Sequence, residues 1–99
     1  MAKVSARVML FATLRRKYGA KDLIVECNGT LPDLIENVSK ILGESFIDEV
    51  YDKNRDRVKE NIILMINGRN VRDMEKIEIR DGDTIAIFPP IAGGQPQRK

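Results

Sequence analysis

Residues 4–13 read VSARVMLFAT, a stretch in which apolar residues occupy every even position. Such an alternation predicts a strand with one buried face. The charged segment 15–19 is expected to turn the chain into a second strand, Asp22–Cys27, which ends at the turn pair Asn28-Gly29. The two strands are therefore predicted to form an N-terminal hairpin.

The next segment predicts the main helix of the chain. Thr30 suits the N-cap, and Pro32 fits the first turn, where its missing N–H is not needed. Gly43 is expected to end the helix. Apolar residues recur between these signals at helical spacing: Leu31, Leu34, Ile35, Val38, Ile41 and Leu42. The apolar side of this helix must pack against a sheet, and the apolar residues at the even positions of 4–13 can form the opposing face.

Three further strands are expected in the second half of the chain. Residues 44–61 favour a short helix followed by a polar loop, although the boundaries there are weakly marked. Ile62–Ile66 predicts a compact strand closed by Asn67-Gly68, a short strand is expected around Val71, and Thr84–Phe88 predicts the last strand.

The first and last strands are both apolar enough to lie centrally in the sheet. Because the crossover between them contains the helix, they are expected to be parallel neighbours. The predicted fold class is α+β, with a mixed sheet of about five strands packed on one main helix, and the β-grasp architecture of ubiquitin satisfies this order.

Composition limits the classes of function. The 99 residues fit one domain, and the longest apolar runs are far too short to span a membrane. With no recognisable secretory signal and a lone Cys27, the cytoplasm is the expected location. Removing Arg98 and Lys99 leaves 15 basic and 15 acidic residues, interleaved along the chain, which argues against nucleic-acid binding.

The chain also lacks the usual equipment of an enzyme. It contains no histidine, and no carboxylates cluster at the spacing of metal ligands, so neither catalytic residues nor a metal site is expected. Cys27 ends a strand with apolar alternate residues and is predicted to be a buried small hydrophobe rather than a reactive thiol.

The segment FPPIAGG, residues 88–94, is the most unusual in the chain. Pro89 and Pro90 cannot continue a sheet ladder, so the predicted domain spans residues 1–88 and a flexible tail spans 89–99. Gly93 and Gly94 lack Cβ atoms, which suits a backbone that passes through a narrow channel of a partner. A merely disordered polar tail is the alternative.

A surface for a partner is expected on the sheet. If the even residues of the first strand face the helix, Met9 and Phe11 face outward, where Phe88 and one set of alternate residues of Ile62–Ile66 join them. Exposed apolar faces of this kind usually mark partner sites. Two alternatives remain open: residues 44–61 fold over this face, or the face closes a homodimer. Arg15 follows the strand and is a further candidate for partner contact.

The chain as a whole resembles the molybdopterin synthase small subunit family of ubiquitin-like sulfur carriers. The resemblance rests on VMLFA at 8–12 with Arg15, on Asn67-Gly68, on DGD at 81–83, and on Phe88-Pro89-Pro90 with Gly93-Gly94. The thiamine sulfur carrier and archaeal ubiquitin-like modifiers look similar but more distant.

The resemblance implies that a ubiquitin-activating-type adenylyltransferase uses ATP to adenylate Gly94, and that sulfur transfer then makes a thiocarboxylate. Gly93 gives passage into the large subunit of molybdopterin synthase, where sulfur is donated during synthesis of the molybdenum or tungsten cofactor. Phe11, Arg15, Phe88, Pro89 and Pro90 are the expected partner contacts. No cofactor is expected to bind tightly, because ATP is used by the partner.

Family members that carry sulfur end at the second glycine, whereas Gln95-Pro96-Gln97-Arg98-Lys99 follows it here. We therefore expect a maturation peptidase to cleave after Gly94. Two other functions remain open: a modifier conjugated to lysines, and a ubiquitin-like interaction module that never conjugates.

Overall fold

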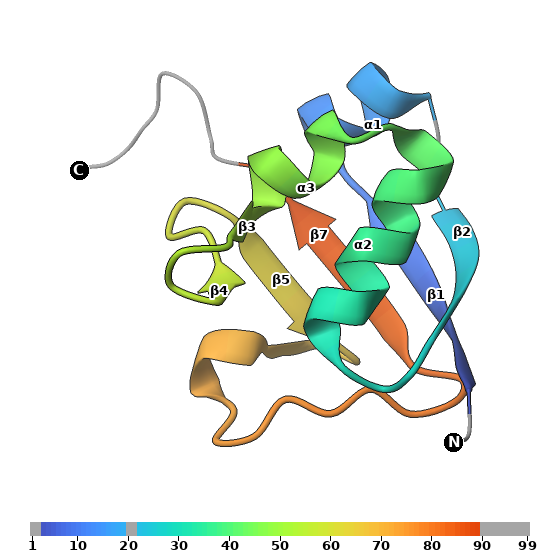
Figure 1. Cartoon of the computed structure of the whole chain (residues 1–99), viewed down its shortest axis with the longest axis vertical. Helices are drawn as coiled ribbons and strands as arrows, with labels where there is room; N and C mark the ends of the chain where they lie inside the picture. The colour runs from blue at the N-terminus through green and yellow to red at the C-terminus, as the bar shows by residue number, and fades with distance from the viewer. Residues whose placement is uncertain (1–2, 20–21, 90–99) are drawn as a thin grey trace.

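The computed structural model describes residues 3–19 and 22–89, which form a five-stranded sheet with the longest helix packed on one face, together with a separate two-stranded hairpin (Figure 1). The helices are α1 (Ala12–Tyr18), α2 (Leu31–Leu42), α3 (Ser45–Val50) and a 3-10 turn at Val71–Asp73. The strands are β1 (Val4–Leu10), β2 (Asp22–Cys27), β3 (Tyr51–Asp52), β4 (Arg57–Val58), β5 (Ile63–Ile66), β6 (Arg69–Asn70) and β7 (Thr84–Phe88).

The main sheet has five strands in the order β2-β1-β7-β5-β6. The central strands β1 and β7 are parallel, with Val8 opposite Ile85 and Leu10 opposite Ile87, and the other neighbours are antiparallel. The predictions of an α+β β-grasp fold and of parallel first and last strands are confirmed. β3 and β4 form a separate two-stranded hairpin.

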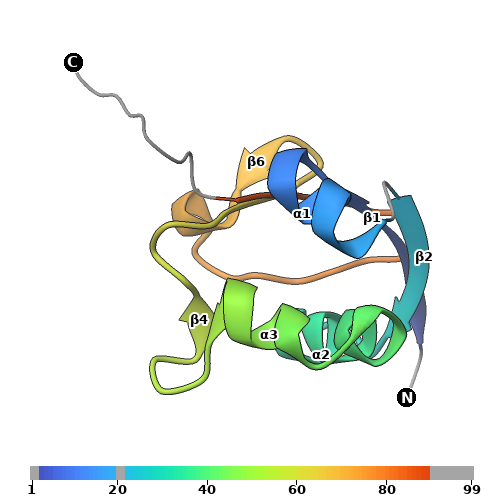
Figure 2. The ribbon, with the colours of Figure 1, turned by 90° about the horizontal axis from the view of Figure 1, so that it is seen from above.

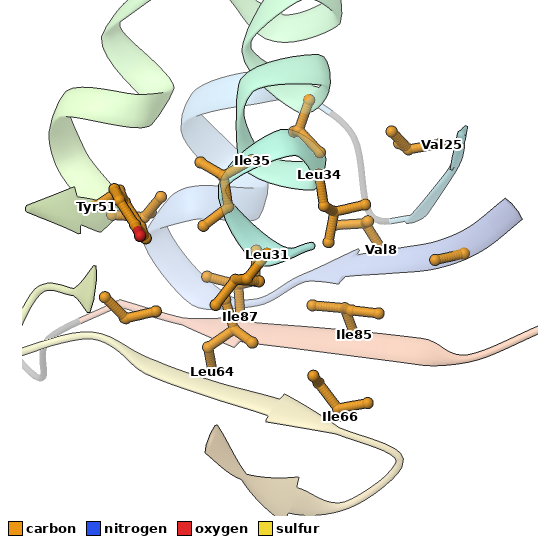
Figure 3. Close-up of a cluster of buried hydrophobic side chains, with 14 of the residues drawn as sticks. Val8, Val25, Leu31, Leu34, Ile35, Tyr51, Leu64, Ile66, Ile85 and Ile87 are labelled. Atoms are coloured by element: carbon orange, nitrogen blue, oxygen red, sulfur yellow. The ribbon is translucent and has the colours of Figure 1, made fainter. Parts of the chain in front are cut away.

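The core lies between the sheet and α2 (Figure 3). The even residues Ala6, Val8 and Leu10 of β1 are buried, as their alternation predicted. The helix supplies Leu31, Leu34, Ile35 and Val38 from its opposing side. Thr30 and Gly43 flank α2 as expected, although the Thr30 side chain makes no capping hydrogen bond. Gly43 adopts φ +125°, a conformation that favours glycine.

The segment after the first strand differs from its prediction. The strand ends at Leu10 rather than Thr13, and residues 12–18 form α1 instead of a charged turn. The helix forms because Leu14 and Tyr18, one turn apart, pack on the core while the arginines and lysine between them remain in solvent. β1 and β2 are therefore antiparallel neighbours joined through a helix, not a tight hairpin.

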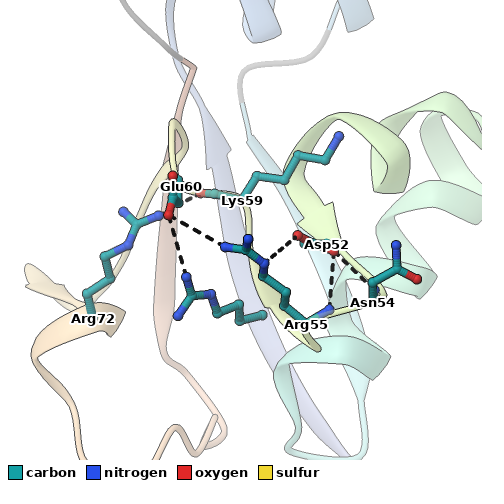
Figure 4. A network of polar contacts seen from close by, with 7 residues as sticks. Asp52, Asn54, Arg55, Lys59, Glu60 and Arg72 are labelled. Atoms are coloured by element: carbon teal, nitrogen blue, oxygen red, sulfur yellow. Dashed lines mark hydrogen bonds and ion pairs between the residues drawn. The ribbon is translucent and has the colours of Figure 1, made fainter.

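Residues 44–61 lie on the helix side of the sheet (Figure 2). Phe46 and Val50 of α3 are buried in the core, which rules out the alternative that this segment folds over the outer face. The hairpin that follows is tied by exposed ion pairs of Arg55 with Asp52 and Glu60 (Figure 4). Such pairs contribute little individually.

The short strand expected around Val71 is also displaced. β6 comprises Arg69–Asn70, and Val71 begins the 3-10 turn with its side chain buried. The Asn70 side chain accepts a hydrogen bond from the Arg72 N–H, which favours a turn over a longer strand. Arg72 in turn donates to the carbonyl oxygens of Lys59 and Ile62, thereby fixing the entry to β5.

Neighbouring residues of β5 test the assignment of the two sheet faces. Leu64 is fully buried, whereas Ile63 is 41% exposed. We expect Leu64→Ala to lower the free energy of unfolding by about 2–5 kcal/mol, because it leaves a cavity. Ile63→Ala is expected to cost less than half as much. Urea denaturation of both variants measures the difference, and equal losses would contradict this assignment.

Candidate functional site

The outer face of the sheet, opposite α2, carries a continuous row of apolar side chains. Met9 of β1 lies opposite Ala86 of β7, which in turn lies opposite Met65 of β5. Ile63 pairs with Phe88 at the end of β7. We define the tail-side face by six residues: Met9, Phe11, Ile63, Met65, Ala86 and Phe88. Ile63 is exposed, and the other five side chains are half-buried, so the whole face is at least partly open to solvent.

Phe11 and Phe88 meet at one end of the tail-side face. Their ring centroids lie 4.4 Å apart with the planes inclined by 10°, so the two rings stack. The Phe11 N–H donates to the Ile87 carbonyl, which extends the pairing of β1 with β7 by one residue. Stacked aromatic pairs contribute about 0.5–1.5 kcal/mol beyond their burial. Sequence reasoning thus brought together two residues that are 77 positions apart, and the structure places them in contact.

The chain turns sharply after Phe11. Ala12 has φ +53°, a left-handed conformation that is uncommon for a residue with a Cβ atom. The Phe11 carbonyl accepts hydrogen bonds from the N–H groups of Leu14 and Arg15. Arg15 is exposed and lies in the first turns of α1, four residues after Phe11.

Helix α1 is held in place by a cluster that sequence reasoning missed. The Lys17 ammonium and the Tyr18 hydroxyl both donate to Glu49 Oε1 of α3, each at 2.6 Å. The Tyr18 ring also meets Phe46 edge-on, with centroids 5.4 Å apart. These contacts could not be predicted from residue spacing, because Glu49 is 31 residues or more from its partners in the sequence. The cluster fixes the helix that carries Arg15.

The cluster shifts the ionisation of its members. Partial burial would raise the pKa of Glu49, but the hydrogen bonds from Lys17 and Tyr18 outweigh it and hold that pKa below its ordinary value. Burial raises the pKa of Tyr18, and its hydrogen bond to Glu49 adds to the effect. At neutral pH Glu49 is therefore an ionised carboxylate that accepts hydrogen bonds from the Lys17 ammonium and the Tyr18 hydroxyl.

The remaining predicted site residues lie at the start of the tail. Pro89 is buried, so the chain still packs on the domain one residue beyond the predicted boundary. Pro90, Gly93 and Gly94 lie outside the described residues. Cys27 is 2% exposed, which confirms the prediction that it is buried, and burial raises its pKa, which disfavours the thiolate.

Among residues 3–19 and 22–89, no group of three or more acidic, cysteine or histidine side chains is arranged to hold a metal ion. Within the same ranges, no helix has both the length and the apolar character needed to cross a bilayer.

The lowered pKa of Glu49 predicts a pH dependence of stability. A lowered folded-state pKa stabilises the fold above the ordinary glutamate value of 4.5, and this stabilisation is lost as the pH falls through the folded value. Glu49→Gln should therefore reduce the free energy of unfolding at neutral pH by less than about 1 kcal/mol, since the pair is partly exposed. The deficit should shrink below about pH 4.5. Asp48→Asn removes an exposed carboxylate of the same helix outside this cluster, and as the control it should lose less stability at neutral pH than Glu49→Gln.

Comparison with known proteins identifies the relatives of this chain. The family model described as the ThiS family matches residues 8–94. A molybdopterin synthase sulfur carrier subunit of Anopheles gambiae is 30% identical, and the alignment covers 92% of this chain and 93% of the relative. Such relatives confirm the prediction of a protein carrier rather than an enzyme.

Solved structures agree with this assignment. The small archaeal modifier protein 1 of Methanosarcina acetivorans superposes with a TM-score of 0.75 at 26% identity, covering 95% of this chain and 100% of that one. A chain from the BexX/CysO complex of Amycolatopsis orientalis gives 0.71 at 25% identity, covering 90% and 99%. Proteins similar to this chain thus act with partner proteins. The chain belongs to the ThiS family of ubiquitin-like sulfur carriers.

Proposed function

We propose that this protein carries sulfur as a thiocarboxylate on Gly94 and donates it in the synthesis of molybdopterin. The stacked Phe11–Phe88 pair supports the proposal most directly, because it sits on an open apolar face at the end of the strand that leads to the diglycine. A partner that binds this face would hold the start of the tail at the same time. The family match, which extends through Gly94, and the similarity to a molybdopterin synthase subunit add support.

The proposed chemistry is supplied by partners. The Gly94 carboxylate attacks the α-phosphate of ATP on a ubiquitin-activating-type adenylyltransferase, releasing pyrophosphate. A donor of sulfur at the sulfide level then displaces AMP and leaves a thiocarboxylate. The large subunit of molybdopterin synthase is the proposed recipient. In this scheme the chain contributes a docking face and a slim end, with Gly93 giving passage and Pro90 stiffening the approach.

Activation requires a free carboxylate on Gly94, yet Gln95 follows it in the sequence. We propose that a peptidase removes residues 95–99 before adenylation. The peptide bond to Gln95 otherwise leaves no carboxylate oxygen to attack ATP.

A second function draws on a specific similarity. The resemblance to small archaeal modifier proteins favours conjugation of Gly94 to lysine amines. Both fates begin with the same adenylate and differ in the nucleophile that displaces AMP. Conjugates of raised mass that disappear on deletion of Gly94 would identify the modifier. A module that never conjugates would give neither product.

Docking through the tail-side face is tested with one substitution. Phe11→Asp places a charge on this face and should abolish adenylation of a chain truncated after Gly94, measured as ATP–pyrophosphate exchange with the activating enzyme. Lys40→Asp alters an exposed residue of α2 and should leave exchange unchanged. Circular dichroism should show both variants folded. An unfolded Phe11→Asp variant would identify Phe11 as a core residue, and normal exchange would refute docking here.

Maturation and loading are tested by the intact mass of the protein isolated from its own cells. Loss of residues 95–99, with a mass increase for sulfur replacing oxygen, is the expected result. Retention of these residues while the cofactor pathway is active would contradict the proposal and favour the non-conjugating module. A mature chain found only on lysines would favour the modifier.

A further inference from the structure

The border strand β2 has no strand neighbour on its outer backbone edge, where the Glu26 carbonyl is bonded to Asn37 and the part around Ile24 is open. β2 pairs only with β1 in the five-stranded sheet as described, and Figure 1 shows it at the border. The Asn37 side chain donates to the Glu26 carbonyl at 2.8 Å, so this carbonyl points away from β1. Because hydrogen-bonding direction alternates along an antiparallel pair, the N–H and C=O of Ile24 also face the open edge.

Two exposed isoleucines flank this edge. Ile24 is 69% exposed on the outer side of the sheet, and Ile41 of α2 is 57% exposed. α2 runs antiparallel to β2 (Figure 1), and Ile41 lies one turn beyond Asn37 on the same side of the helix. Ile41 therefore borders the edge from the helix side, facing the part of β2 around Ile24. Natural proteins usually protect open edges with charge or proline rather than flank them with large apolar side chains.

The charges on β2 indicate what kind of strand could pair with this edge. Asp22 and Glu26 lie on the outer side, two residues either side of Ile24. A second copy, pairing antiparallel with Ile24 opposite Ile24, would set Asp22 against Glu26 twice, and like charges directly opposite destabilise a sheet. A strand with basic residues at those positions would instead gain two favourable cross-strand pairs. Asp22 already contacts Arg7, at 2.8 Å, so Glu26 is the stronger determinant.

We propose that the β2 edge binds an extended segment of a partner protein by β-strand addition. The segment carries an apolar residue opposite Ile24, a Lys or Arg opposite Glu26, and apolar side chains toward Ile41. The segment would pair with β2 at the border of the sheet, whereas the Phe11–Phe88 pair lies at the ends of β1 and β7. The proposal does not rest on the proposed sulfur chemistry.

A synthetic peptide tests the proposal. The capped peptide Gly-Lys-Val-Ile-Val-Lys-Gly has the required pattern, and a version with Glu in place of both Lys is its charge control. Titration of the full chain, followed by amide chemical shifts, should show changes confined to β2 and the C-terminal half of α2. The Lys peptide should bind about ten times more tightly than the Glu peptide, given two cross-strand charge pairs.

Variants of the chain distinguish this site from other surfaces. Glu26→Lys should abolish the preference between the two peptides, because each peptide then makes one favourable and one unfavourable charge pair. Glu60→Lys, the same charge change on an exposed residue outside β2, should leave the preference unchanged. Ile24→Ser should weaken both peptides, and circular dichroism checks the fold of each variant. Shifts centred on Phe11 and Phe88, an unchanged preference in Glu26→Lys, or self-association lost in Ile24→Ser would overturn the proposal, the last in favour of a second copy.

Discussion

The parallel pairing of β1 with β7 is the constraint on which the rest of the structure depends. It joins the beginning and end of the domain, so every other element lies within one long crossover. The loop-closure entropy of bringing such distant segments together is offset by burying Val8, Leu10, Ile85 and Ile87 at the centre of the core. Because parallel strands point the same way, Phe11 and Phe88 emerge at the same end of the sheet.

Alternate residues of β1 and β7 have different roles: those facing inward stabilise the core, and those facing outward form the proposed contact surface. Inward residues pack against α2, while the next residue along each strand belongs to the tail-side face. A one-residue slip in register would exchange these roles and expose the core, so the hydrophobic pattern that stabilises the fold also fixes which side chains a partner can meet. The stacking of Phe11 on Phe88 therefore follows from the register of buried residues.

Sequence reasoning succeeded where the signal is periodic and local. The alternation of residues 4–10, the helical spacing of residues 31–42 and the strand at 84–88 all produced the elements expected. It failed for α1, because the charged residues 15–17 hide the pair formed by buried Leu14 and partly buried Tyr18. Tyr18 packs on Phe46 of α3, which is distant in the sequence. The contact of Phe11 with Phe88 was predictable from strand parity. The role of Glu49 was not, since only the tertiary fold brings it to α1.

A carrier of this kind has no need for a reactive centre of its own, and the arrangement of the domain reflects that. The one thiol is buried, and the ionisable cluster around Glu49 secures a helix rather than activating a nucleophile. The surfaces for which we propose contacts are an apolar face beside the start of the tail and the outer edge of β2. β1 pairs with both β2 and β7, so the position of each surface is fixed by the same buried core.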